Sequence, residues 1–372
     1  MKKLLLITEA GGAGVLSAIE TICSHLVDEY KITFVYSRRN ETPELAEMRS
    51  RFPHQIDLVP VDSGGWMGKA RIFRLYRKMT HELEPDVVHL HSSIAGFVGR
   101  LSTMFARRKP RLFYSPHCFS FSRSDIGPLK RRLFYLLEKM GCLAGAEIIA
   151  VTRSEADQAK RIGASSVHVV YNSMLPEMDV SIAATKKRVL RIGMIGRITA
   201  QKDPFFFLNT ASQVLKFTNR TAVEFIWVGG GEDRKMHEMV SRARALMIED
   251  RVRITGWIPR AKVLDELKQM DIYLHTAEWE AHPIAILEAF SVGKPVVLRK
   301  YAGAEEIVEH DSNGYLCSSV DEAAFATLRL INDAEKRIEL GRAGVERLRN
   351  VFDPIQQMNH LRNIYSGRSK PI

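Results

Sequence analysis

Two glutamates lie eight positions apart in the segment EWEAHPIAILEA, residues 278–289. Paired carboxylates can hydrolyse a glycosidic bond when they stand about 5 to 9.5 Å apart on either side of it. Here Glu280 precedes a proline, whereas Glu288 lies in the apolar run that follows, which is typical of a buried helix. Whether the two acids can share one bond depends on the elements that carry them.

The elements around this segment separate the two carboxylates. The run DIYLH, residues 271–275, predicts a strand, Pro283 suits the first position of a helix, and Gly293 suits its end. Glu280 is then in the loop before the helix, whereas Glu288 lies about five residues inside the helix, roughly 7.5 Å along its axis. A loop acid and a helix acid on the same side do not flank one bond, so hydrolysis is not favoured.

An elongated anionic ligand fits this arrangement better, with one acid near each end of it. Its phosphates would meet the N–H groups at the positive end of the helix. The residues expected there are Ile284, Ala285 and Ile286.

A basic pair stands at the end of another predicted strand, in GMIGRITAQKDP, residues 193–204. Arg197 and Lys202 are five positions apart and can converge on one diphosphate, the guanidinium as a fork and the ammonium as a point charge. This pair therefore predicts a phosphate site.

A glycine-rich loop, TEAGGAG at residues 8–14, follows the first predicted strand and precedes a helical run. Glycines such as Gly12 and Gly14 let backbone N–H groups approach an anion, although a simple tight turn is the alternative. The dinucleotide fingerprint GxGxxG does not occur, and basic residues rather than an acid end the second strand, which disfavours hydride transfer.

Length and composition indicate two domains of an ordinary globular protein. A chain of 372 residues exceeds the usual size of one core, and 45% hydrophobic with 26% charged residues is a common balance. The opening apolar run is too short for a signal peptide, and no run is long enough to span a bilayer. Four widely spaced cysteines without a CxxC pair argue against zinc and favour a reducing, cytoplasmic compartment.

The formal charge of +11 is concentrated in the first half. Residues 69–81 hold five Lys/Arg and no acid, and residues 100–132 hold nine Lys/Arg against Asp125. Apolar residues near helical spacing in the first stretch predict an amphipathic helix, either at an anionic membrane surface or on an ordinary protein surface. No nucleic-acid motif accompanies the charge, so a nucleic-acid partner is not expected.

Short apolar runs alternate with helical patterns along the whole chain, which predicts βαβ units and parallel sheets. Polar residues 173–188 interrupt the pattern and are interpreted as a linker. We therefore expect an α/β fold of two doubly wound, Rossmann-like domains facing a central cleft. The expected domains are residues 1–175, rejoined by a C-terminal helix at 353–372, and residues 189–352.

At this point the motifs resemble those of the retaining family 4 glycosyltransferases of the GT-B fold. EAHPIAILEAFSVGKPVV resembles their E-x7-E segment, and GRITAQKD resembles their diphosphate-binding Arg/Lys pair. FIWVGGGEDR and RITGWIPR resemble the two strand-loop motifs between them. The resemblance covers nearly the whole chain and is closer in the second domain than in the first.

The resemblance implies roles for the second-domain residues. Those matching Arg197 and Lys202 neutralise the nucleotide diphosphate, the one matching Glu288 binds the ribose hydroxyls, and the one matching Glu280 lies near the donor sugar. The loop around Trp257 and Ile258 would hold the base.

In the first domain the resemblance implies that Gly12 faces the phosphates and that His117 approaches the transferred sugar. His91 in VHLHSS is open to a purely structural interpretation as a strand-end histidine.

Two segments depart from the family pattern. Ala281-His282 replaces the usual Gly-Phe type of pair after the first glutamate, which leaves the donor sugar open. NSM at residues 172–174 replaces the frequent Asn-Gly after the last strand of the first domain, which would affect only interdomain geometry.

The function implied is transfer of a sugar, with retention of configuration, from a nucleotide-diphosphate donor, UDP-sugars being favoured. A lipid-linked saccharide acceptor in surface polysaccharide synthesis, at the inner face of the plasma membrane, fits the basic first domain. No metal or other cofactor is expected, because Arg197, Lys202 and the helix N-terminus would stabilise the leaving group. A nucleotide-sugar 2-epimerase, a glycogen-synthase-like polymerase and a noncatalytic nucleotide-sugar binder are the alternatives.

Overall fold

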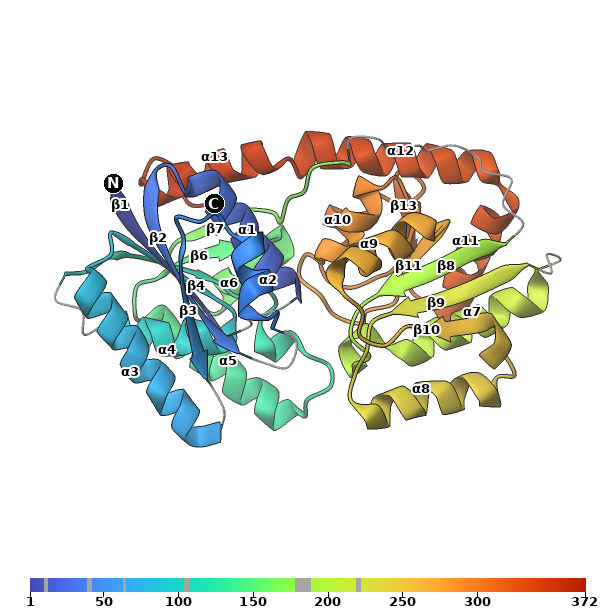
Figure 1. The fold of residues 1–372 in the computed structure, drawn as a ribbon, viewed down its shortest axis with the longest axis horizontal. Helices are drawn as coiled ribbons and strands as arrows, with labels where there is room; N and C mark the ends of the chain where they lie inside the picture. Colours follow the sequence, from blue (N-terminus) through green and yellow to red (C-terminus); the bar gives the residue numbers. More distant parts are fainter. Residues whose placement is uncertain (10–12, 39–41, 63–64, 104–107, 178–188, 219–221) are drawn as a thin grey trace. The chain divides into compact units, whose positions relative to one another are not determined.

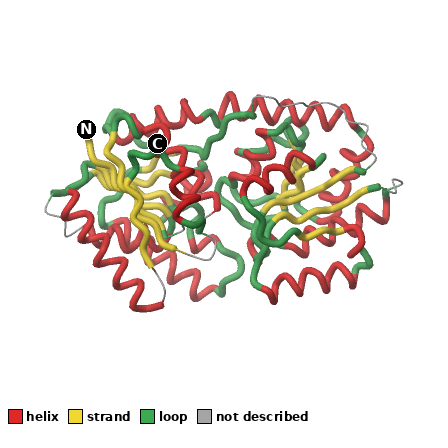
Figure 2. Tube along the Cα trace, viewed as in Figure 1, coloured by secondary structure: helices red, strands yellow, loops and turns green. Residues whose placement is uncertain are grey.

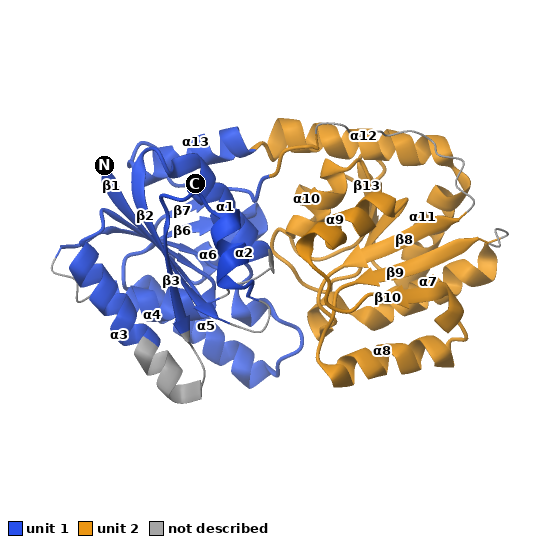
Figure 3. Ribbon diagram, in the orientation of Figure 1, with its two compact units in different colours: residues 1–173, 354–372 blue, residues 174–353 orange. Residues whose placement is uncertain are grey.

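The computed structural model describes residues 1–9, 13–38, 42–62, 65–103, 108–177, 189–218 and 222–372. The apolar runs that predict strands, such as DIYLH at residues 271–275, form strands within these ranges. The chain divides into one unit of residues 1–173 and 354–372 and a second of residues 174–353 (Figure 3). Among the described residues, no helix combines the length and the apolar character needed to cross a membrane.

The first unit is built on a parallel sheet whose described strands run in the order β3-β2-β1-β4-β5-β6-β7 (Figures 1 and 2). Successive residues of a strand point to opposite faces, so Leu4 and Leu6 of β1 enter one core while Leu5 and Ile7 enter the other. The strands are β1 (Lys2–Thr8), β2 (Tyr30–Arg38), β3 (Asp57–Asp62), β4 (Val87–His91), β5 (Arg111–Ser115), β6 (Glu147–Ala150) and β7 (Val167–Val169).

Helices cover both faces of this sheet. One face carries α1 (Ala13–Leu26), α2 (Leu45–Arg51) and the C-terminal α13 (Pro354–Tyr365). The other face carries α3 (Gly65–Leu83), α4 (Ser93–Thr103) and α6 (Arg153–Arg161), and α5 (Pro128–Cys142) packs against α4. A short 3-10 turn, η1 (Ser120–Ser122), precedes α5.

The second unit has a parallel sheet whose described strands run in the order β10-β9-β8-β11-β12-β13. The strands are β8 (Leu190–Ile195), β9 (Val223–Val228), β10 (Val252–Ile254), β11 (Ile272–His275), β12 (Val296–Arg299) and β13 (Gly314–Cys317). The helices are α7 (Pro204–Phe217), α8 (Asp233–Ala245), α9 (Arg260–Gln269), α10 (Ile284–Ser291), α11 (Val320–Asn332) and α12 (Ala334–Val351), with 3-10 turns η2 (Ala200–Lys202), η3 (Glu249–Arg251) and η4 (Ala304–Glu306). The expected α/β architecture with two doubly wound sheets is confirmed.

Each sheet has one place where the strand order reverses. In the first unit β1 lies between β2 and β4, and in the second β8 lies between β9 and β11. Ligands of open α/β sheets bind beside the carboxyl ends of the strands at such a switch point. The loops after β1 and β4, and those after β8 and β11, are therefore where binding residues should gather.

Helix α3 contains the basic stretch 69–81, for which the sequence left two interpretations open. Ile72 and Tyr76 are buried in the core beneath the sheet, and Leu75 and Met79 pack against the same core. The described apolar residues of this helix therefore pack within its own unit. This packing favours the ordinary amphipathic helix of the two interpretations, and contact of this stretch with a membrane stays a prediction.

Candidate functional site

The loops that follow β8 and β11 lie side by side at the carboxyl ends of these two strands. The Thr276 hydroxyl donates a hydrogen bond to the Lys202 carbonyl at 2.7 Å. The Glu278 amide donates to the Gln201 carbonyl at 2.9 Å. These bonds hold the basic loop against the loop that contains the first glutamate.

Lys202 and Glu280 form an ion pair at this junction. The Lys202 ammonium donates to the Glu280 carboxylate, and the two side chains are only 17% and 13% exposed. Nε2 of His275, a fully buried residue, lies 4.0 Å from the same carboxylate. Burial, with the positive charge of Lys202, lowers the pKa of His275 well below its usual value, so its ring is neutral. The charge of Lys202 is therefore balanced by Glu280 alone in this cluster.

Arg197 begins the same loop, and its side chain is exposed. A Cβ atom at Gly196 would lie 3.2 Å from Cε of Lys202, so the lysine side chain passes closely over the backbone directly before Arg197. Both cations thus stand at one strand end. Their convergence on a diphosphate stays a prediction.

Glu288 pairs with a residue that the sequence did not point to. Its carboxylate is 5% exposed and accepts a hydrogen bond from the guanidinium of Arg260, the first residue of α9, whose side chain is 38% exposed. Arg260 ends the RITGWIPR motif, but nothing in the motif shows that its side chain returns to α10. The carboxylate expected to bind a ligand is therefore held by a cation that can swing towards solvent.

Trp257 presents an open aromatic face next to the glycine turn after β9. Its side chain is 61% exposed, and a Cβ at Gly230 would come within 2.7 Å of the indole ring. Gly229 has φ 138°, and a Cβ there would lie 2.3 Å from the Gly196 carbonyl oxygen. Only glycines allow these close approaches, which join the loops after β8, β9 and β10. Ile258, half-buried, continues this surface.

The first turn of α10 offers fewer donors than expected. Ile284 is 7% exposed and Ile286 is fully buried, with Ala285 between them partly exposed. The Ile286 amide donates to the Pro283 carbonyl at 3.1 Å. Because this amide is already engaged within the turn, it is not open to a phosphate without rearrangement.

His282 does not face an open site in this structure. Its side chain packs edge-on against Phe352, with ring centroids 4.9 Å apart, and the residue is 4% exposed. Burial, followed by the charge of Arg347, lowers the pKa of His282 to about 3. The imidazole of this unusual histidine is therefore part of the packed interior of the second unit.

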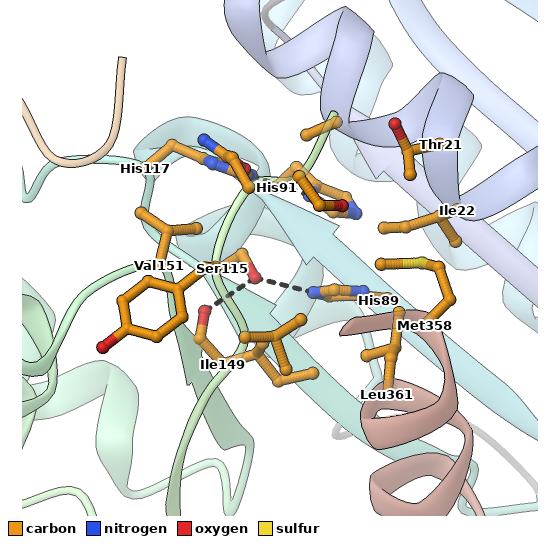
Figure 4. Close-up of a pocket in the computed structure, with 15 residues that line it drawn as sticks. Thr21, Ile22, His89, His91, Ser115, His117, Ile149, Val151, Met358 and Leu361 are labelled. Atoms are coloured by element: carbon orange, nitrogen blue, oxygen red, sulfur yellow. Dashed lines mark hydrogen bonds between the residues drawn. The ribbon is translucent and has the colours of Figure 1, made fainter. Parts of the chain in front are cut away.

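In the first unit His117 belongs to a row of three histidines at the ends of β4 and β5 (Figure 4). Nδ1 of His91 and Nε2 of His117 are hydrogen-bonded at 2.9 Å, and the rings stack. His89 bonds to the Tyr365 hydroxyl at 2.6 Å and to the Ser115 hydroxyl at 2.9 Å. His91 thus joins His117 in one hydrogen-bonded pair.

The small cavity beside this row is lined by residues of the first unit, including the three histidines and side chains of α1 and α13 (Figure 4). Its volume of about 30 Å³ is room for little more than a water molecule.

Glu155 braces the segment that carries His117, a role that sequence reasoning missed. His117 and Cys118 have φ of 51° and 87°, which is unusual for residues with side chains. The buried Glu155 carboxylate accepts from the Cys118 amide at 2.7 Å and from the Val151 amide at 2.8 Å. The sequence Thr152-Arg-Ser-Glu155 is a capping-box pattern, which is the signal that could have indicated this residue.

The glycine loop can be described only in part. Gly12 lies outside the described residues, and Gly14 is in the first turn of α1. Directly before the loop, the buried carboxylate of Glu9 accepts from the amides of Ile94 and Ala95 at 3.2 and 2.8 Å. Glu9 therefore caps α4 and links the end of β1 to the end of β4, where His91 stands.

Burial lowers the pKa of His89 to about 3. We expect His89→Gln to reduce the acid sensitivity of the fold. The unfolded chain takes up a proton at this position near pH 6.5 whereas the folded chain does not, so its contribution to stability is present at neutral pH and is lost as pH falls. Between pH 7.5 and 5.5 the contribution of His89 to the free energy of unfolding falls by about 1.3 kcal/mol. The free energy of unfolding of the variant should therefore fall by that much less than that of the wild type. Urea unfolding at both pH values measures it, and equal losses in the two proteins would contradict the assignment.

Two family profiles match the chain: the one described as Glycosyltransferase Family 4 matches residues 12–174, and the one described as Glycosyl transferases group 1 matches residues 179–347. Together the two matched ranges span most of the chain, and they meet close to the boundary between the two units.

Curated relatives and solved structures point the same way. UDP-Gal:alpha-D-GlcNAc-diphosphoundecaprenol alpha-1,3-galactosyltransferase of Escherichia coli is 23% identical over 310 residues, which cover 79% of this chain and 78% of that protein. The putative colanic acid biosynthesis glycosyltransferase WcaL of Escherichia coli is 26% identical over 61% of this chain and 54% of its own length. Among solved structures, Anabaena Alr3699/HepE in complex with UDP and glucose has a TM-score of 0.79 at 20% identity, over 99% of this chain and 100% of that one. The chain belongs to the family 4 glycosyltransferases, which have the GT-B fold.

Proposed function

We propose that this protein transfers a sugar from a UDP-sugar to a lipid-linked saccharide acceptor, with retention of configuration, in the synthesis of a surface polysaccharide. The observation that carries the proposal is the Lys202–Glu280 pair, with Arg197 in the same loop, at the switch point of the second sheet. A cation paired with a carboxylate at this place can bind the phosphates of a donor while the carboxylate faces its sugar.

Two relatives support the choice of donor and acceptor. One structure of the Anabaena protein contains UDP and glucose, and another contains UDP-glucose. The name of the Escherichia coli galactosyltransferase states a UDP-galactose donor and a diphosphoundecaprenol-linked acceptor. We infer a uridine donor and a lipid-linked acceptor by likeness to these proteins, and a cytoplasmic location at the inner face of the membrane follows from such an acceptor.

In the mechanism that we propose, the acceptor hydroxyl attacks the anomeric carbon on the face from which UDP departs. The bond from the anomeric carbon to the phosphate oxygen breaks, the new glycosidic bond forms, and the leaving phosphate takes the acceptor proton. Arg197 and Lys202 offset the charge that builds on that phosphate, without a metal ion. Activity that persists in EDTA would support the last point.

The remaining residues position the donor. Glu288 would bind the ribose hydroxyls, which requires Arg260 to move aside or to join the contact. Trp257 and Ile258 would hold the uracil, because the exposed indole offers a flat face for a planar ring. Glu280 would bind the sugar hydroxyls while Lys202 fixes its carboxylate. In the first unit, Gly12 would lie near the phosphates and His117 would contact the transferred sugar.

Thermal shifts with UDP, GDP and ADP, each free and as sugar nucleotides, test the donor, and UDP is expected to give the largest shift. Transfer to a short lipid-linked acceptor, with the anomeric configuration of the product read by NMR, then tests the reaction. An inverted product would contradict retention. Epimerised sugar nucleotide formed without acceptor would indicate the epimerase, and binding without any turnover would indicate a noncatalytic binder.

A further inference from the structure

Helix α5 carries a continuous row of exposed apolar side chains. They are Leu129, Leu133, Leu136 and Met140, together with Leu143 at its C-terminal cap, and their exposed fractions are 83%, 52%, 47%, 61% and 85%. At about 100° per residue these positions fall within roughly 80° of one another around the helix. We call this row the α5 stripe.

The opposite side of α5 already fixes the helix to its unit. The buried Glu138 carboxylate accepts from Arg100 at 2.6 Å and from the Tyr114 hydroxyl at 2.9 Å. The Tyr135 hydroxyl donates to the Arg161 carbonyl at 2.9 Å. The α5 stripe is therefore not needed to hold the helix in place, and its exposure is not explained by packing within the unit.

The charge on the outer side of α5 is entirely positive. Lys130, Arg132 and Lys139 are exposed, and by their helical positions they flank the α5 stripe. Glu138 is the single acid in the sequence of this fully described helix, and it points inward. The outward surface of α5 is thus apolar along its middle and basic along its edges.

Most other cations of the basic stretch 100–132 are neutralised within the first unit. Four of them pair with carboxylates of the described residues, in the pairs Arg100–Glu138, Arg108–Asp86, Arg111–Glu147 and Arg123–Asp125. Arg131 donates to the Arg123 carbonyl. Among the described cations of this stretch outside such pairs, Lys130, Arg131 and Arg132 belong to α5, and Lys130 and Arg132 flank the α5 stripe; Lys109 lies outside the helix.

We propose that α5 is a membrane-docking surface, whose stripe enters the interface of an anionic bilayer while Lys130, Arg132 and Lys139 meet the lipid headgroups. An apolar row flanked by cations is the pattern that binds such a surface. Burial of the apolar side chains and attraction of the cations to anionic lipid both favour binding, and the long basic side chains can reach the headgroups. A second copy of the chain fits less well, since a symmetric pairing of two α5 stripes would bring identical cations together.

Docking through this surface would bring the protein to a lipid-linked acceptor in the membrane. This purpose rests on the proposed function, whereas the docking itself does not. It is built from residues of the first unit that are separate from the donor-binding residues of the second. Binding to vesicles that contain neither donor nor acceptor therefore tests the surface alone. Failure of the UDP thermal shift would count against the donor site and leave the surface untouched.

The test is flotation of the full chain with vesicles of phosphatidylcholine containing 30% phosphatidylglycerol. The wild-type protein should bind these vesicles, and it should bind vesicles of pure phosphatidylcholine much more weakly. The triple variant Leu133→Gln, Leu136→Gln, Met140→Gln should bind at least about tenfold more weakly. Replacing Lys130, Arg132 or Lys139 with alanine should each weaken binding about fivefold.

A matched control replaces Ile355 and Phe325 with glutamine, because these side chains are 58% and 72% exposed outside α5. The control should bind vesicles as the wild type does, and all variants should keep the wild-type thermal unfolding and UDP shift. The proposal is overturned if the wild type does not bind the anionic vesicles, or if the triple variant binds them equally well. It is also overturned if the triple variant converts a dimer to a monomer without affecting vesicle binding.

Discussion

Replacing Lys202 with alanine is expected to lower kcat by about 10² to 10³-fold, with the fold intact. In the proposed mechanism the costly step is departure of the nucleotide diphosphate, and removing one preorganised donor to a developing oxyanion typically costs a factor of this size. Lys202 is held by Glu280 and is 17% exposed, so its position is fixed before the donor binds. Initial rates at saturating donor measure the effect.

Two controls separate chemistry from stability. Lys216→Ala removes an exposed lysine of the same unit, in the last turn of α7, and should leave kcat unchanged. Removing Lys202 leaves the Glu280 carboxylate, 13% exposed, without its cation, which lowers stability. The double variant Lys202→Ala, Glu280→Gln should therefore have an unfolding temperature closer to that of the wild type than Lys202→Ala has. Turnover at the wild-type rate in Lys202→Ala would show that this loop does not bind the leaving group.

The sheets were predictable because both faces of each are buried. A strand covered on two sides must be a short apolar run, as LLLI in β1 and VVL in β12 are, and such runs are visible without knowledge of their neighbours. Parallel pairing and the switch points follow from the alternation with helices. The placement of Lys202 and Glu280 beside each other follows in turn, because the loops that carry them leave the neighbouring strands β8 and β11 on the same edge.

The sequence could not show which surface covers an amphipathic helix. Helices α3 and α5 both have apolar and basic residues at helical spacing, yet Tyr76 of α3 is fully buried and Leu136 of α5 is 47% exposed. Periodicity shows that an apolar face exists, but only tertiary packing determines whether the protein or something else covers it. For the same reason the sequence left two interpretations of the stretch 69–81 open.

Long-range polar pairs also could not be predicted from the sequence. Arg260 and Glu288 are 28 positions apart, and Glu155 reaches back 37 positions to the Cys118 amide. Each contact depends on how a loop leaves its strand, which local propensity does not fix. A buried carboxylate nevertheless needs partners, so Glu288 inside an apolar helix already implied that some cation or ligand would meet it.

Replacing Glu288 with glutamine is expected to weaken UDP binding by about 10²-fold. The carboxylate lies within α10 and is 5% exposed, where hydrogen bonds to an ionised acceptor contribute about 1.5 to 3 kcal/mol each. The ribose offers two hydroxyl donors, and the neutral amide presents one acceptor oxygen in place of two. Isothermal titration with UDP measures the change directly and does not depend on the acceptor.

Arg260→Ala separates a binding role of Glu288 from a structural one. If Arg260 only occupies the carboxylate until the donor arrives, its removal leaves a buried charge unpaired, which lowers stability but lets UDP bind as well or more tightly. Arg253→Ala is the matched control, because Arg253 pairs with Glu266 on the exposed side of the same unit at 2.7 Å. That control should change neither property. Were Glu288→Gln to lose stability as Arg260→Ala does while binding UDP at the wild-type affinity, the pair would be structural and the ribose would bind elsewhere.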